Sequence, residues 1–269
     1  MIDEVQTTDS LDLSSLRHVL VSKDFAGDVR RWQRALNRPQ AISENAIGKA
    51  FSWCSEGAGH STSIVLMQSD FFQGVVHGIS IARGILCHEL AHVHEYAQRL
   101  PETNYEAPDA RDLDAVLEFI AQSVASEYLA ERVASRQYST EDLADFVANA
   151  DTIVALLNSF DQEKHAYRSH GDTLHIWQHS ILAVSRAADM TGRTIGEYYR
   201  ERRLFDEFIR RLKNPKWAGI AEQLSAALTR DTSKREVAGR VSGGTIREMF
   251  HAVGVYPRLQ EGGLYIDIP

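Results

Sequence analysis

The sequence predicts an α+β fold that is mostly helical and contains one small sheet. Long stretches repeat apolar residues at helical spacing, most clearly between Asp112 and Arg136. β-branched residues between polar flanks are confined to short segments, of which Ser63–Gln68 is the clearest candidate strand. The chain has 269 residues, of which 43% are hydrophobic and 25% charged, values that are typical of a globular protein and exclude wholesale disorder.

The first part of the chain is expected to alternate strands and helices. Asp24–Leu36 and the stretch from Ser80 to about Arg99 are predicted helices, and prolines just beyond each of them cannot continue a helix. A short apolar run, Val19–Val21, is a second candidate strand beside Ser63–Gln68. Residues 52–61 combine glycines and serines and are predicted to form a loop.

The rest of the chain is expected to be almost entirely helical. Ser139-Thr140-Glu141-Asp142 is typical of a capped helix start, and we expect that helix to reach about Phe160. Further helical patterns cover residues 172–191, 195–213 and 215–230, and the alternating tail 264–268 predicts a short strand. We therefore expect a core over residues 1–160 and a helical C-terminal subdomain over 161–269 that packs on it, the two forming either separate parts or one domain.

Charge and composition limit the classes of binding partner and the cellular compartment that we expect. The net charge of −8 argues against a broad phosphate-binding surface, and the arginines between 200 and 213 alternate with acids, so no nucleic-acid partner is expected. Two cysteines cannot form a disulfide framework. The acidic start and the short apolar runs predict a cytoplasmic protein with no membrane partner, although a leaderless secreted protein would look the same. The sequence predicts no oligomeric state.

The most informative motif is His88-Glu89-Leu90-Ala91-His92, an HExxH sequence inside a predicted helix. Residues four apart on a helix lie about 40° from each other around its axis, so both imidazoles can reach one Zn²⁺ ion. Glu89, next to the first histidine, can accept a proton from a water molecule at such an ion. The structural alternative is a pair of buried histidines that are satisfied by hydrogen bonds.

The residues after this motif decide which zinc-protein subclass it resembles. A metzincin would need glycine at 95 and histidine at 98, where this chain has Glu95 and Gln98. Glu127-Tyr128-Leu129-Ala130-Glu131-Arg132-Val133-Ala134 instead gives an E-x-x-A-E-x-x-A pattern on a predicted helix. With HExxH, this pattern resembles the gluzincin group of zinc metallopeptidases, including its compact bacterial and phage-type members, over residues 80–136. Gluzincins more often carry aspartate at the position of Glu131.

The resemblance implies a zincin-like core and a set of site residues. Glu127 would be the third metal ligand, and Glu131 would accept the N–H of a ligand histidine and fix its tautomer. Glu118 and Glu95 are rivals for the ligand role, with Glu95 better placed to support a histidine than to ligate. A strand ahead of the active-site helix, here Ser63–Gln68, would be an edge strand that pairs with extended substrate.

Zinc peptidases of this kind place a downstream histidine or tyrosine near the reacting carbonyl. Our order of candidates is His175, then His179, then Tyr167, and His175 and His179 stand four apart with Asp172 as a helix cap before them.

The sequence therefore predicts a zinc metallopeptidase that hydrolyses a polypeptide substrate. Zn²⁺ would be bound by His88, His92 and Glu127, and Glu89 would be the general base, with His175 as the second catalytic residue. Two alternatives stay open: a catalytically inactive metal-binding sensor or interaction protein, and an amide hydrolase that acts on a small molecule or a cell-wall peptide. The sequence alone does not indicate which substrate would be cleaved.

Overall fold

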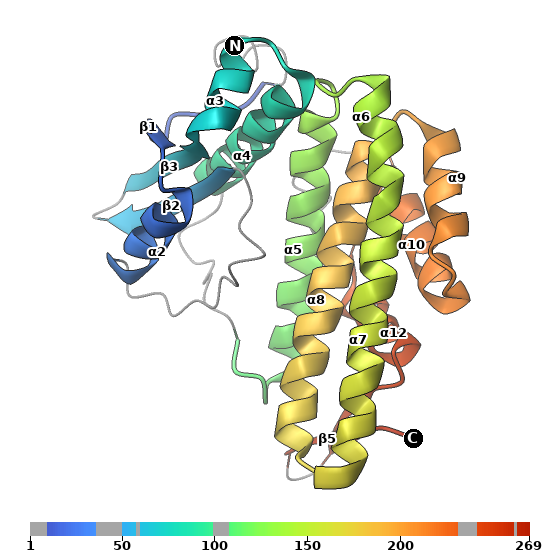
Figure 1. The fold of residues 1–269 in the computed structure, drawn as a ribbon. Coiled ribbons are helices and arrows are strands. Elements are labelled where there is room, and N and C mark those ends of the chain that lie inside the picture. Colours follow the sequence, from blue (N-terminus) through green and yellow to red (C-terminus); the bar gives the residue numbers. More distant parts are fainter. Residues whose placement is uncertain (1–9, 36–49, 58–59, 99–107, 231–240, 261–262) are drawn as a thin grey trace. The chain divides into compact units, whose positions relative to one another are not determined.

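A computed structural model describes residues 10–35, 50–57, 60–98, 108–230, 241–260 and 263–269 (Figure 1). The chain forms two compact units. Unit 1 comprises residues 1–103 and 133–142, and unit 2 comprises residues 104–132 and 143–269. The predicted α+β class, mostly helical with a small sheet, is confirmed. The expected division at 160/161 differs from these units, because both residues lie inside one continuous helix of unit 2.

Unit 1 is a three-stranded sheet with helices on both faces. Its strands are β1 (Leu16–Ser22), β2 (Ala50–Gly57) and β3 (His60–Gln68), and its helices are α2 (Phe25–Ala35), α3 (Ser69–Val76) and α4 (Ser80–Gln98). The strand order is β1-β3-β2, with β1 parallel and β2 antiparallel to β3. Strand β2 falls largely where a loop was predicted, and α3 was not predicted.

The central position of β3 corrects one expectation. Ser63–Gln68 was expected to be an edge strand that pairs with substrate, but its backbone already pairs with β1 on one side and β2 on the other. Alternate side chains of β3 enter two cores: Leu66 packs with Phe25 and Val29 of α2, whereas Val65 and Met67 pack against α3 and α4. A strand buried on both faces and paired on both edges has no room for a substrate strand.

Helix α4 is held firmly in unit 1. Its residues Leu86, Cys87, Leu90 and Val93 are buried in the same core as Val65 and Met67 of β3. Gly84 lets the ring of Tyr138 lie on the helix, since a Cβ there would come within 2.0 Å of a ring carbon.

The start of α4 is tied to a helix cap. Ser139 and Asp142 form the predicted capping box of α6 (Thr140–Asp145), with each backbone N–H bonded to the other side chain. The same Asp142 carboxylate accepts the hydroxyl hydrogen of Ser80, the first residue of α4. The HExxH motif therefore lies on a helix that is fixed by packing along its length and by a hydrogen bond at its N-terminus.

Unit 2 is built from helices and one hairpin. The long helices are α5 (Leu113–Ala134, of which the last two residues belong to unit 1), α7 (Asn149–His170) and α8 (Thr173–Glu197). The shorter elements are the 3₁₀ turn η2 (Phe146–Ala148), α9 (Arg202–Arg211), α10 (Pro215–Leu228), α12 (Gly243–Ala252) and the antiparallel strands β4 (Tyr256–Gln260) and β5 (Gly263–Asp267). Helix α12 and strand β4 were not predicted, and α8 runs through the break expected between 191 and 195.

The core of unit 2 is aromatic. Trp177, Trp217, Phe208 and Phe250 are almost fully buried, and the rings of Trp177 and Phe250 lie 5.0 Å apart. Both indole N–H groups are satisfied, that of Trp177 by the carbonyl oxygen of Ala110 at 2.5 Å and that of Trp217 by a threonine hydroxyl at 3.1 Å. These contacts hold α8 to its neighbours along its length.

Two glycines let α8 approach α5 closely. A Cβ at Gly192 would lie 2.7 Å from the carbonyl oxygen of Val124, and one at Gly196 would lie 2.6 Å from that of Tyr128. Glycine is a poor helix former, so its use twice in the last two turns of a 25-residue helix reflects this close backbone approach.

Within the described residues, one helical stretch, Thr140–Ser169, is long and apolar enough to cross a membrane by length and composition. A packed helix of a globular protein passes the same criterion, and α7 buries Ile153, Leu157 and Phe160 in unit 2.

The close approach of α5 and α8 predicts that a larger side chain at Gly196 destabilises the protein. Gly196→Ala should lower the free energy of unfolding by roughly 1–3 kcal/mol despite alanine's better helix propensity, because its Cβ would clash with backbone atoms. Gly219→Ala in α10 is the matched control, since nothing lies within 4 Å of a Cβ there, and it should add up to ~1 kcal/mol. Urea unfolding of both variants measures the difference; equal effects of the two substitutions would contradict the close approach.

Candidate metal centre

The two motif histidines converge within unit 1. His88 is 6% exposed, the side chain of His92 is 13% exposed, and their Nε2 atoms lie 3.0 Å apart with the rings nearly perpendicular. If both atoms were 2.05 Å from one ion, the N–Zn–N angle would be about 94°, which requires only a small opening to reach tetrahedral geometry. The pair therefore fits a Zn²⁺ ion. A 3.0 Å separation also fits a hydrogen bond between the rings, which is the structural alternative.

Glu95 supports this pair from one turn further along α4. Its Oε2 lies 3.5 Å from Nδ1 of His92, the ring atom opposite the converging Nε2. A carboxylate at Nδ1 favours the tautomer that leaves Nε2 available to a metal. The expectation that Glu95 supports a histidine rather than ligating agrees with this geometry. Glu89 is half-buried next to His88 in the sequence.

The C-terminal half of α4 is also tied to the start of the chain. Nδ1 of His94 accepts the backbone N–H of Asp12 at 2.6 Å, and the Asp12 carboxylate accepts a hydrogen from Gln98 at 3.0 Å. His94 and Gln98 thus have structural partners away from the converging nitrogens.

Unit 2 positions the predicted third ligand, Glu127, next to an arginine. Nε of Arg193 on α8 donates to Oε2 of Glu127 at 2.5 Å, and the Glu127 side chain is 16% exposed. The Glu127 carboxylate, with smaller contributions from Glu131 and Asp189, raises the pKa of Arg193 above its usual value, so the guanidinium stays charged. Arg193 was not singled out from the sequence, because nothing in a lone arginine on a helix indicates its partner 66 residues away.

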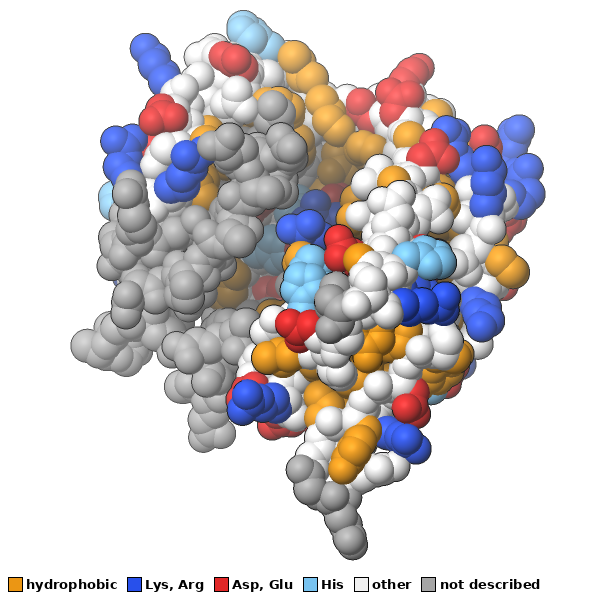
Figure 2. All heavy atoms as spheres, turned by 60° about the horizontal axis from the view of Figure 1, so that its bottom comes forward, with side chains coloured by type: hydrophobic (Ala, Val, Ile, Leu, Met, Phe, Trp, Pro, Cys, Tyr) orange, Lys and Arg blue, Asp and Glu red, His pale blue; other side chains and the backbone are white. Residues whose placement is uncertain are grey.

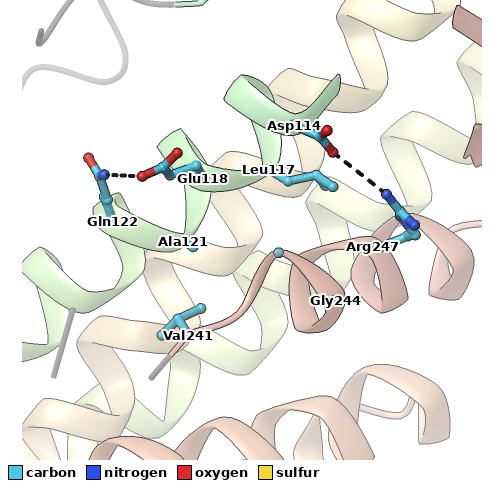
Figure 3. A pocket seen from close by; sticks show the side chains of 9 residues that line it. Asp114, Leu117, Glu118, Ala121, Gln122, Val241, Gly244 and Arg247 are labelled. Carbon is cyan, nitrogen blue, oxygen red and sulfur yellow. Dashed lines mark hydrogen bonds and ion pairs between the residues drawn. The ribbon is translucent and has the colours of Figure 1, made fainter. Parts of the chain in front are cut away.

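Glu118, the other rival ligand, lies on a different side of α5. It is nine residues before Glu127, which is half a turn around the helix and about 13 Å along it. Glu118 accepts a hydrogen bond from Gln122 at 3.1 Å and lines a cavity of about 590 Å³ between α5 and α12 (Figure 3). Arg247 and Asp114 form a 3.9 Å ion pair at the same cavity. Asp114 is therefore paired with Arg247 and Glu118 is bonded to Gln122, so the two carboxylates are not directed at one point.

Glu131, the predicted partner of a ligand histidine, is buried in unit 2 at 7% exposure. One turn along α8 from Arg193 lies a second buried acid, Glu197, at 5% exposure, and Asn149 donates to both of its oxygens at 3.4 and 3.2 Å. Burial, followed by the charge of Glu131, raises the pKa of Glu197 well above its ordinary value. The two glutamates and Arg193 form an acidic cluster with one cation where α5 meets α8.

His175 cannot serve the same site as Glu127. Both Arg193, which bonds Glu127, and His175 lie on α8, and they are 18 residues apart. At 1.5 Å per residue this is about 27 Å along one helix, whereas an oxyanion donor must lie about 3 Å from the reacting atom. His179 is only one turn closer, and Tyr167 lies on α7 near the same end, with its hydroxyl 3.5 Å from Thr173. The predicted cap is confirmed, since Asp172 accepts the backbone N–H of His175 at 3.0 Å.

Comparison with known proteins gives no match, whether to a protein-family model, to a characterised protein sequence or to a solved structure. The geometry of the residues is therefore the basis for any functional proposal.

The burial of Glu197 predicts a pH-dependent stability. Because its folded-state pKa is raised, the unfolded state binds fewer protons above the ordinary glutamate pKa of about 4.3, and stability is lost as the pH rises through the folded-state value. Glu197→Gln should therefore raise the free energy of unfolding at pH 7–8, and the gain should vanish below about pH 4. Urea unfolding between pH 4 and 8 measures it, with the exposed Glu222→Gln as control. A gain that is equal at all pH values would contradict the assigned cause.

Proposed function

We propose that this protein is a zinc-dependent hydrolase of peptide bonds, with His88, His92 and Glu127 as metal ligands and Glu89 as general base. The observation that supports this proposal most strongly is the convergence of the two Nε2 atoms to 3.0 Å on α4, with Glu89 next to the first of them in an HExxH sequence. Two imidazoles and a carboxylate with an open fourth position form the ligand set of catalytic rather than structural zinc sites.

Glu127 is proposed as the third ligand from the E-x-x-A-E pattern and from its chemistry within unit 2. A carboxylate has two oxygens, and Arg193 occupies only Oε2. The arginine fixes the side chain without neutralising its capacity to ligate through the other oxygen. Arg193 is in this proposal a positioning residue, since it acts through Glu127. Glu131 keeps its proposed role as the acid that orients a ligand histidine.

Bound Zn²⁺ would supply Lewis-acid polarisation of the scissile carbonyl and would lower the pKa of a coordinated water molecule. Glu89 accepts the proton of the attacking water and delivers it to the leaving amine. Glu95, at Nδ1 of His92, keeps that imidazole in the ligating tautomer. His175 has no part in this mechanism, because the length of α8 separates it from Glu127. A zincin-like arrangement of the sheet and α4, and a cytoplasmic location, belong to the same proposal.

A second candidate function is a metal-binding sensor or interaction protein. The converging Nε2 atoms of His88 and His92 suit it equally well, since metal binding alone requires no general base. Both functions require a bound metal, but only the first includes hydrolysis of peptide bonds. A measurement of hydrolytic activity therefore distinguishes them.

Glu89→Gln tests the general base. The variant should retain one zinc equivalent at this site and lose about 10²–10⁴-fold in hydrolysis of unfolded polypeptides, because the amide cannot accept the proton. His92→Ala should lose the zinc equivalent of this site. His94→Ala is the matched control on the same helix, because its ring nitrogen bonds the Asp12 backbone. Metal analysis and cleavage of a peptide library measure both properties; full activity of Glu89→Gln would rule out the mechanism.

Arg193→Ala tests the positioning of Glu127. We expect the Kd for Zn²⁺ to rise about 10-fold or more, since groups that orient a ligand typically contribute 10–100-fold to metal affinity. Arg186→Ala, an exposed arginine on the same helix, should leave the Kd unchanged. Competition with a chromophoric chelator provides the measurement. Tighter binding in Arg193→Ala would mean that the arginine competes with the metal for the carboxylate.

A further inference from the structure

A second group of metal-ligating side chains lies entirely within unit 2, at the end of the α7–α8 hairpin. His175 and His179 stand one turn apart on α8, and Glu163 faces them from α7. One ligand atom from each of the three lies within 4.8 Å of the others. The hairpin turns at Gly171, whose left-handed backbone (φ 70°) ends α7, and Asp172 caps α8 immediately after it.

The distances within this group suit a small ion. Oε2 of Glu163 is 3.9 Å from Nε2 of His175 and 4.0 Å from Nδ1 of His179, and the two imidazole rings are 4.2 Å apart between centroids. Ligands of a tetrahedral ion at 2.0–2.2 Å are about 3.3–3.6 Å from one another, so the group needs to close by about half an ångström. The side chains are 40–45% exposed, which leaves them room for that movement and leaves the site open to solvent.

We propose that Glu163, His175 and His179 bind a divalent transition-metal ion of the Zn²⁺ class, separately from the His88–His92 centre. Two imidazoles select against Mg²⁺ and Ca²⁺, which prefer oxygen ligands, and one carboxylate completes a set that zinc, nickel and copper accept. Three protein ligands leave at least one position for water. The turn of the α7–α8 hairpin lies at the bottom of Figure 1, and Figure 2 brings this side forward by a rotation of 60°; some histidine side chains show at the surface of that face.

Binding there joins two antiparallel helices near their connecting turn. An ion that binds the folded hairpin and not the unfolded chain raises the stability of unit 2 in proportion to the logarithm of its concentration over Kd. The proposal does not depend on the hydrolase function, because it uses none of the residues of the first centre. His175 and His179 lie too far from Glu127 to take part in the proposed hydrolysis, and metal binding at this second site would give them a role.

The test uses the full chain with both histidines of the first centre removed (His88→Ala/His92→Ala), stripped with a chelator and titrated with Zn²⁺ by calorimetry. We expect this parent to bind one equivalent. His179→Ala and Glu163→Gln, each added to the parent, should raise the Kd at least 10-fold and abolish most of the zinc-induced rise in Tm. His165→Ala, an exposed histidine on α7 outside the group, is the matched control and should change neither.

The outcomes separate the two sites. A parent that binds no Zn²⁺, or binds it equally well with His179→Ala and Glu163→Gln, overturns the second site. Equal zinc content in wild type and parent would instead count against the first centre and leave the second standing. If the parent does not fold by circular dichroism, the same substitutions in the wild-type chain must lower its zinc content from two equivalents to one; an unchanged content overturns the proposal.

Discussion

The separation of 3.0 Å between two imidazole nitrogens on α4 is the constraint on which the functional account depends. It arises from helix geometry, since residues four apart share a face, and from the packing that holds α4 against the sheet and under Tyr138. His88 is buried, so its ring has little freedom to turn away. Glu95 adds a carboxylate on the far side of the second ring. A rigid helix thus presents two preorganised nitrogens close to the geometry that a zinc ion would require.

In unit 2 the proposed ligand Glu127 is positioned by the close packing of two helices, α5 and α8. Gly192 and Gly196 remove the Cβ atoms that would keep α8 away from α5, and the resulting close approach brings Arg193 to Glu127. The same approach buries Glu131 and Glu197, at a cost that shows in the raised pKa of Glu197. Such a cluster of buried charge is expensive to fold, which is why we attach a role to it beyond stability. In the proposed function that role is to hold a ligand carboxylate in one orientation.

The sequence predicted what depends on local pattern and missed what depends on distant partners. Helical periodicity located α4, α5 and α10 to within a few residues, and the capping box at Ser139 and the cap at Asp172 were both found. Strand β2 was missed because glycines and serines also occur in paired strands, where the neighbouring strand decides. The prediction that Ser63–Gln68 is an edge strand was wrong because strand order depends on two other segments, β1 and β2, which pair with it on either side. His175 was chosen by residue type alone, and only the length of α8 shows that it lies far from Glu127.

The central claim is that His88 and His92 bind Zn²⁺ together with Glu127. The most direct measurement is a crystal structure of the zinc-loaded protein with an anomalous difference map recorded at the zinc edge. Our account predicts a peak about 2.0–2.1 Å from both Nε2 atoms and from one Glu127 oxygen, with the fourth position held by water. Absence of a peak between the two histidines, or a peak there with four protein ligands and no open position, would contradict it.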